Sequence, residues 1–347
     1  MGDVYGTVKV AAVQAASVFL DREGSTEKAC RLIAEAGEIG ARVIAFPEGF
    51  IPAHPVWYHH HAASGAIANK LAVELFKNSV EIPGPETDAL CAAARAANAY
   101  VVIGVCEKTP NTMGTMFNTQ LYIGPDGTLI RKHQKIMPTV GERLVHMGGY
   151  GDTFGAFQSE FGPMSGLICG ENSNPLAVFA LIAEGTRIHV MSWPNHFPTS
   201  GDPLRNRVAI DSQAFAQMSK AFVISACGTV DERMIEMLKT SPEGEKFLRN
   251  PDCCGGSLIV DPMARIIAGS MGAEEGILYA DCNLDLGIQM KLRHDFAGHY
   301  NRPDIFQLNI NRAAPQLYRV HNDPTALPGQ NADMLPPPAA RLAPPDE

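Results

Sequence analysis

A cysteine that follows an apolar run is the first residue able to do covalent chemistry. Cys169 comes directly after Gly-Leu-Ile and before Gly170, Glu171 and a second apolar run with helical spacing. A side chain at such a strand-to-helix turn is exposed on a sharp bend, and the N-terminus of the helix offers amide groups and a positive dipole. Because a free thiol with a pKa of about 8.5 is mostly protonated at neutral pH, this help matters to a nucleophile. This position therefore favours a reactive Cys169 by stabilising its thiolate form; an inert buried cysteine is the alternative.

Two carboxyl groups and one amine are the other candidates. Glu48 ends the apolar run RVIAFPE, at the sheet edge where α/β enzymes place their sites, and burial would raise its pKa towards that of a general base. Lys135 precedes apolar residues in RKHQKIMPT, which favours a lysine that is desolvated and turned inward. Glu142 would orient that lysine or share a proton with Glu48. Taken singly, each is equally well explained as a salt bridge, a cap or part of a solvated face.

Apolar runs that alternate with helical patterns predict the elements that position these side chains. Strands are expected at 8–14, 42–48, 100–106, 165–170, 187–193, 221–228 and 276–282, hairpins at 117–135 and 256–269, and helices at 25–40, 66–79, 86–98, 174–185 and 205–219. Ser25 offers a partial N-cap to the first helix, and Thr87 is the candidate N-cap of the third. The alternation predicts an α/β fold with one mixed sheet or two sheets.

Composition and charge exclude several classes of protein. Of the 347 residues, 46% are hydrophobic and 19% are charged, which is typical of a globular chain. A net charge of −9 and the lack of a polybasic run argue against nucleic acid and membrane partners. The sequence has no apolar run long enough to span a bilayer, and its N-terminus does not resemble a signal peptide. We therefore expect a cytoplasmic protein whose eight cysteines are free thiols.

Proline content separates the end of the chain from the rest. No linker is visible inside residues 5–310, so residues 1–312 are expected to form a single domain. Residues 321–347 hold 7 of the 25 prolines, which predicts an extended or disordered tail at 313–347. An arm that contacts a neighbouring subunit is the alternative.

Three segments, taken together and in this order, resemble the signatures of the nitrilase superfamily, the carbon–nitrogen hydrolases. They are FPEGF with Glu48, RKHQKIMPTVGER with Lys135 and Glu142, and GLICGENSNPL with Cys169. IPAHPVW (51–57), GGSLIVDPMARIIA and GHYNRPDIF (298–306) are similar to the branch of true nitrilases, and the likeness covers about residues 7–310. The resemblance implies a four-layer α-β-β-α sandwich that dimerises through its outer helices. For true nitrilases it also implies further assembly into spirals.

The resemblance also implies an activity, the hydrolysis of organic nitriles to carboxylic acid and ammonia. Cys169 would attack the nitrile carbon and form a thioimidate and then a thioester, with Glu48 as the general base. Lys135 and the backbone N–H after Cys169 would stabilise the developing charge, and Glu142 would hold Lys135 in place. A small nitrile is the implied partner, and neither a cofactor nor a metal is required.

The sequence departs from the family pattern at two positions, where nitrilases usually carry tryptophan. Gly170 follows the cysteine, and His146 lies shortly after the Glu-Arg pair. The missing bulk at Gly170 is expected to widen the pocket beside the thiol, so no substrate preference is inferred. Gly170, Trp57, Trp193 and His196 are the expected substrate contacts.

Other interpretations stay open. An amidase or carbamoylase of the same superfamily would use the same residues, because nitriles and amides pass through the same thioester. A Cys-His thiol enzyme would use His189 or His196 instead, and a catalytically inactive binding protein would use none of them. The histidines near Glu48 lack zinc-type Cys/His spacing, so they are expected to form a pocket wall or loop. They are His54, His59, His60 and His61.

Overall fold

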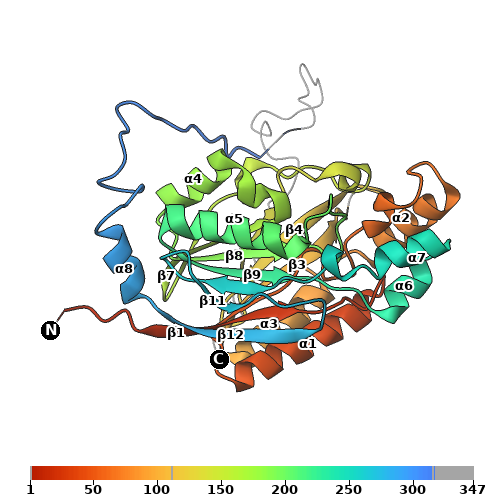
Figure 1. Ribbon diagram of the computed structural model, residues 1–347, viewed down its shortest axis with the longest axis horizontal. Coiled ribbons are helices and arrows are strands. Elements are labelled where there is room, and N and C mark those ends of the chain that lie inside the picture. The colour runs from red at the N-terminus through yellow and green to blue at the C-terminus, as the bar shows by residue number, and fades with distance from the viewer. Residues whose placement is uncertain (1, 111, 315, 317–347) are drawn as a thin grey trace, which may run out of the picture. The chain divides into compact units, whose positions relative to one another are not determined.

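A computed structural model describes residues 2–110, 112–314 and 316 of the chain (Figure 1). One compact unit ends at Ala313, and a second begins at Ala314. The tail predicted at 313–347 lies almost entirely outside the described residues. Among the helices of the described part, none combines the length and the apolar character needed to cross a bilayer.

Two six-stranded mixed sheets form the centre of the first unit. The first sheet has the order β12 (Gly276–Asn283), β1 (Thr7–Gln14), β2 (Val43–Ala45), β3 (Tyr100–Lys108), β4 (Met116–Ile123) and β5 (Leu129–Gln134). The second has the order β11 (Ile266–Gly269), β10 (Leu258–Val260), β9 (Phe222–Cys227), β8 (Ile188–Trp193), β7 (Gly162–Ile168) and β6 (Phe157–Ser159). The expected strands and hairpins are all present, and strands buried on both faces, such as β2, β3 and β9, are near-continuous apolar runs.

Helices cover the outer face of each sheet, which gives four layers (Figure 1). The first sheet packs on α1 (Arg22–Glu38) and α3 (Pro85–Ala97), and the second packs on α4 (Pro175–Ala183) and α5 (Leu204–Ser219). Strand β1 shows how the layers are built. Val8 and Val10 pack between the two sheets, whereas Ala11 and Val13 pack towards the helices, as the two-residue period of a strand requires.

Further helices lie at the ends of the sandwich. The short helices α6 (Glu232–Leu238) and α7 (Pro242–Leu248) pack with α2 (Ala66–Asn78) in a separate apolar cluster. Helix α8 (Asp285–Lys291) follows the last strand. The sequence analysis did not predict α6, α7 or α8, because a seven-residue helix is too short to show a clear period.

Both predicted N-caps are wrong. Asp21 caps α1, since its Oδ1 accepts the Gly24 N–H at 2.9 Å, and Ser25 lies inside the helix. Gly84 is the N-cap of α3, and Thr87 is the third residue of the first turn, where its Oγ1 accepts the Gly84 N–H at 2.8 Å. Residue type alone does not fix a cap, because capping also needs the residue at which the backbone leaves its extended conformation.

Candidate active site

Strand direction brings Glu48 and Lys135 to one edge of the first sheet. β2 is parallel to β3, and β5 runs in the same direction because two antiparallel pairings separate it from β3. Glu48 lies just beyond β2, and Lys135 directly follows β5. The Glu48 backbone N–H donates to the Trp193 carbonyl at 3.0 Å, which joins this edge to the end of β8 in the second sheet. Cys169 directly follows β7, the neighbour of β8.

The predicted amine and carboxyl groups form one buried hydrogen-bonded cluster. Lys135 Nζ donates to Glu48 Oε1 at 2.6 Å and to Glu142 Oε2 at 2.7 Å. All three residues are at most 3% exposed. Glu142 lies in the 3-10 turn η2 (Val140–Leu144), where it also accepts the Thr139 N–H at 2.9 Å. The structure thus brings together side chains that are 87 positions apart, as predicted for Glu48 and Lys135.

Burial and charge give the two carboxyl groups different roles. Burial raises the pKa of Glu48 to about 7, against the lowering effect of Lys135, and the nearby Glu142 charge adds to the rise. Burial would also raise the pKa of Glu142, but Lys135 and His146 outweigh it and hold that pKa well below the usual range. Although burial by itself lowers the pKa of Lys135, the two carboxylates outweigh burial and keep that pKa well above its usual range. At neutral pH the ammonium is therefore held by Glu142, while Glu48 is poised to exchange a proton.

Cys169 lies on a sharp bend, as its sequence position predicted. Its φ of +52° places a non-glycine residue in the left-handed region, and the 3-10 turn η4 (Cys169–Ser173) starts at this residue. The side chain is 8% exposed. A cysteine in this backbone conformation is unusual and is typical of residues at functional sites.

Burial outweighs the features of the sequence that favour a thiolate at Cys169. Burial raises the pKa of the thiol well above its usual range, and the Glu48 charge raises it further. Lys135 and a hydrogen bond from the Gly170 backbone lower this pKa without reversing the shift. A short 3-10 turn provides less dipole than the helix expected here, so desolvation prevails. The thiol is the resting form, and it needs a base to remove its proton.

Asn118 is a central residue of the cluster that the sequence analysis missed. It lies in β4, and its Nδ2 donates to Glu48 Oε1 and to Glu142 Oε1, both at 2.6 Å. The amide therefore holds the two carboxylates on either side of the ammonium. Three consecutive polar residues, Asn-Thr-Gln, in an otherwise apolar strand were the signal that could have found it.

Two histidines also contact the carboxylates. His146 Nδ1 lies 3.2 Å from Glu142 Oε1, so the residue that replaces the usual tryptophan supports the cluster. His54 Nδ1 lies 3.7 Å from Glu48 Oε1, and burial lowers the pKa of His54 to about 3, which leaves this ring neutral. Ligand atoms of Glu48, His54 and Glu142 lie within 4.8 Å of one another, as a metal site would require. Lys135 already bonds both carboxylates, so a metal ion would have to displace its ammonium.

The structure places the four expected substrate contacts in different surroundings. Trp193 packs in the same apolar cluster as Cys169, whereas Trp57 packs in another cluster, against Phe19. His196 Nε2 lies 2.9 Å from the Phe247 carbonyl. These contacts with substrate stay predictions.

Space is available beside the thiol at Gly170. A Cβ added at this position would meet only Thr139 Oγ1, at 3.6 Å, which is an ordinary contact distance. A side chain at this position would therefore meet no steric obstacle at its Cβ, and the expected widening of the pocket stays a prediction.

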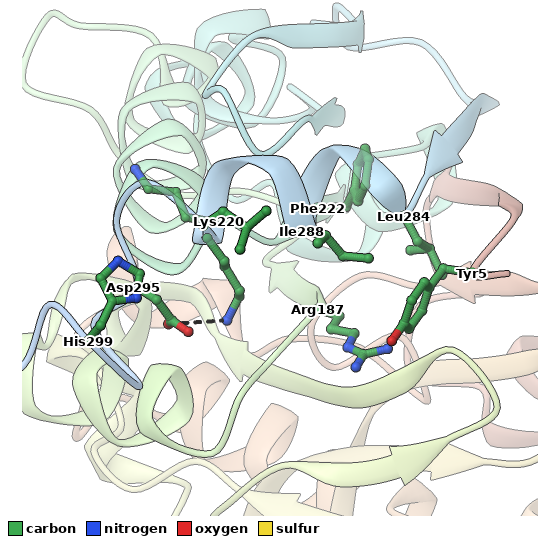
Figure 2. Close-up of a pocket in the computed structure, with 11 residues that line it drawn as sticks. Tyr5, Arg187, Lys220, Phe222, Leu284, Ile288, Asp295 and His299 are labelled. Carbon is green, nitrogen blue, oxygen red and sulfur yellow. Dashed lines mark ion pairs between the residues drawn. The ribbon is translucent and has the colours of Figure 1, made fainter. Parts of the chain in front are cut away.

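A cavity of about 230 Å³ lies elsewhere, at the start of β9 and beneath α8 (Figure 2). Figure 2 shows Tyr5 and Arg187 at one end of it and Asp295 and His299 at the other. Its lining residues Arg187 and Phe222 lie at the amino ends of β8 and β9, whereas Cys169 follows the carboxyl end of the parallel strand β7. This cavity is therefore not part of the candidate site.

Comparison with known proteins shows the family to which the chain belongs. The sequence matches the carbon-nitrogen hydrolase family over residues 9–291. It is 36% identical over 313 residues to Nitrilase 2 of an unknown prokaryotic organism, covering 90% of this chain and 95% of that protein. It is 34% identical over 310 residues to a nitrilase of Bacillus sp. (strain OxB-1), covering 89% of each chain.

A solved structure confirms the predicted four-layer sandwich. Saccharomyces cerevisiae Nit3, a member of branch 10 of the nitrilase superfamily, superposes with a TM-score of 0.64 at 19% identity, covering 84% of this chain and 97% of that one. Fold, sequence match and relatives lead to one conclusion: this chain belongs to the carbon-nitrogen hydrolase family, whose members include the nitrilases.

Proposed function

We propose that this chain is a nitrilase that hydrolyses organic nitriles to carboxylic acid and ammonia, with Cys169 as the nucleophile. One observation carries the catalytic assignment: the Lys135 ammonium lies buried between the Glu48 and Glu142 carboxylates, close enough to Cys169 to lower the pKa of its thiol. The preference for nitriles over amides rests on the relatives, since the proteins that match over about nine-tenths of the chain are named nitrilase.

The first half of the proposed reaction forms a covalent thioimidate. Glu48 removes the thiol proton as the sulfur of Cys169 attacks the nitrile carbon, and a carbon–sulfur bond replaces one bond of the C≡N group. The proton passes to the nitrogen. Lys135 and the Gly170 backbone N–H stabilise the charge that builds on this nitrogen, and one such donor typically contributes a factor of about 10²–10³ in rate.

The second half uses two water molecules. Glu48 activates the first, which adds to the thioimidate carbon, and ammonia leaves with the proton that Glu48 returns. This step produces a thioester. The second water breaks the carbon–sulfur bond, releases the acid and restores the thiol. Glu142 stays ionised throughout and keeps Lys135 protonated and in place, as its lowered pKa requires.

Assembly and substrate contacts belong to the same proposal. We expect Gly170, Trp57, Trp193 and His196 to contact the substrate, and the chain to form homodimers through its outer helices. Assembly of these dimers into spirals and a cytoplasmic location also stay predictions.

A panel of aliphatic, aromatic and arylaceto nitriles, each compared with its amide, tests the proposed activity. Ammonia, acid and amide are quantified for every compound. We expect at least one nitrile to give acid and ammonia faster than the matching amide does. Hydrolysis of amides with no turnover of any nitrile would instead establish the amidase or carbamoylase alternative.

Asn118 provides a test of Glu48 as the base. The activity should rise with pH through the pKa of Glu48, about 7, because the carboxylate is the form that accepts a proton. The hydrogen bond from Asn118 lowers this pKa, so Asn118→Ala should move the acid limb of the kcat/KM profile upward by about one pH unit.

The neighbouring residue of the same strand offers a matched control. Thr119 Oγ1 donates to Glu107 Oε2 at 2.8 Å, so Thr119→Ala also removes a buried hydrogen bond to a glutamate, but one outside the cluster. The acid limb of the kcat/KM profile of Thr119→Ala should coincide with that of the parent chain. If the acid limb of Asn118→Ala is also unshifted, Glu48 is not the general base.

A further inference from the structure

The left-handed backbone of Cys169 needs support from its surroundings. A non-glycine residue adopts such a conformation only where neighbouring contacts enforce it. Two consecutive side chains of η4, Glu171 and Asn172, provide contacts of this kind. Both are buried, at 6% and 4% exposure, and the reaction proposed above uses neither.

Glu171 joins the backbone beside the thiol to the backbone beside the ammonium. Its Oε2 accepts the Ile168 N–H at 3.0 Å, and its Oε1 accepts the Ile136 N–H at 2.7 Å. Ile168 directly precedes Cys169, and Ile136 directly follows Lys135. The position of this carboxylate is itself set by His133 of β5, whose Nε2 lies 3.0 Å from Oε2. A single side chain therefore fixes the spacing between the two strand ends that carry the nucleophile and the lysine.

Asn172 holds the other side of the same turn. Its Nδ2 donates to the Cys169 carbonyl at 2.9 Å, and its Oδ1 lies 2.9 Å from His189 Nε2. Burial lowers the pKa of His189 to about 3, so this ring is neutral, and its Nδ1 lies 2.8 Å from Ser165 Oγ. Both nitrogens of His189 are therefore engaged by Asn172 and Ser165, which leaves neither to act as a base for Cys169.

We propose that Glu171 and Asn172 are positioning residues that hold Cys169 in its left-handed conformation and set the thiol against Lys135 and Glu48. This inference rests on the proposed role of Cys169 as the nucleophile. Hydrogen bonds from backbone on both sides of the bend, anchored by His133 and His189, supply the constraint. When these hydrogen bonds are lost, the Cys169 sulfur can move away from the Lys135 ammonium, although no group that touches the substrate has been removed.

Glu171→Gln tests the proposal with little change in volume. A carboxamide has one acceptor oxygen, so its NH₂ group must face either the Ile168 or the Ile136 N–H, and one backbone donor loses its partner. We expect kcat to fall by about 100-fold with KM little changed, because small misplacements of a reacting group have effects of this size. Alkylation of Cys169 by iodoacetamide, followed by peptide mass spectrometry, should slow in parallel.

Asp261→Asn is the matched control. Asp261 is also a buried carboxylate, and its Oδ1 accepts the Met263 and Arg265 N–H groups at 2.8 and 3.1 Å, but it lies in the β10–β11 hairpin. Asp261→Asn should lose thermal stability much as Glu171→Gln does. Its kcat and its rate of Cys169 alkylation should equal those of the parent chain. An equal loss of kcat in both variants would reduce Glu171 to a structural role.

Asn172→Ala keeps the test decisive if Glu171→Gln does not fold, since it removes the bond to the Cys169 carbonyl instead. Slower alkylation and lower kcat in this variant support the proposal, and parent rates in this variant overturn it. Alkylation needs no nitrile. A parent chain that hydrolyses no nitrile would therefore refute the proposed activity while the alkylation rates still decide whether Glu171 and Asn172 position the thiol.

Discussion

Lys135→Ala should abolish nitrile hydrolysis while the chain remains folded. In the proposed reaction the ammonium stabilises the developing charge, and it also neutralises the Glu48 and Glu142 carboxylates that it bonds at 2.6 and 2.7 Å. Without it the pKa of Glu48 rises further, so the base is protonated at neutral pH. The two effects together should lower kcat/KM by at least about 1,000-fold. Steady-state kinetics measure the loss of activity, and thermal unfolding shows whether the variant remains folded.

A lysine within β5 offers the control for Lys135→Ala. Lys132 forms an ion pair with the buried Glu107 of β3, outside the cluster, so Lys132→Ala also removes a lysine from a buried carboxylate. Each variant should lose stability, by up to about 3–5 kcal/mol where the remaining charge stays buried. Only Lys135→Ala should lose activity. Retention of most activity by Lys135→Ala would favour the Cys-His thiol enzyme instead.

Cys169→Ala should eliminate turnover altogether, because the thioimidate and the thioester both require the sulfur. In the parent chain, mass spectrometry after rapid quenching should find a substrate-derived adduct on the peptide that contains Cys169. The adduct should be missing from the Ala variant. Thermal stability should change little, since only one sulfur atom is removed.

Cys227→Ala is the appropriate comparison, because Cys227 ends β9 in the same sheet, one strand beyond β8, and is fully buried. This variant should keep full activity and show any loss only in stability. Turnover in Cys169→Ala at the parent rate would contradict the proposed nucleophile. Failure of an alkylating agent to label Cys169 selectively in the parent chain would support a binding protein without catalytic activity.

The sequence by itself predicted most strands, the longer helices and the candidate reacting groups. Continuous apolar runs predict strands buried on both faces, and the alternation with helical patterns predicts an α/β fold. Glu48, Lys135 and Cys169 could be named because each comes at or just beyond the end of an apolar or hairpin strand. These signals are local, so a window of a few residues contains them.

Only the tertiary structure decided how those groups behave. The resting state of Cys169, the left-handed turn beneath it and the bridging role of Asn118 all depend on contacts between distant segments. A pKa is set by burial and by charges a few ångströms away, and those charges lie on other strands. The N-cap of α1 is Asp21 and not Ser25, the residue that the sequence predicted, because capping depends on where the backbone turns. Long-range proximity is a property of packing, and no local pattern in the chain records it.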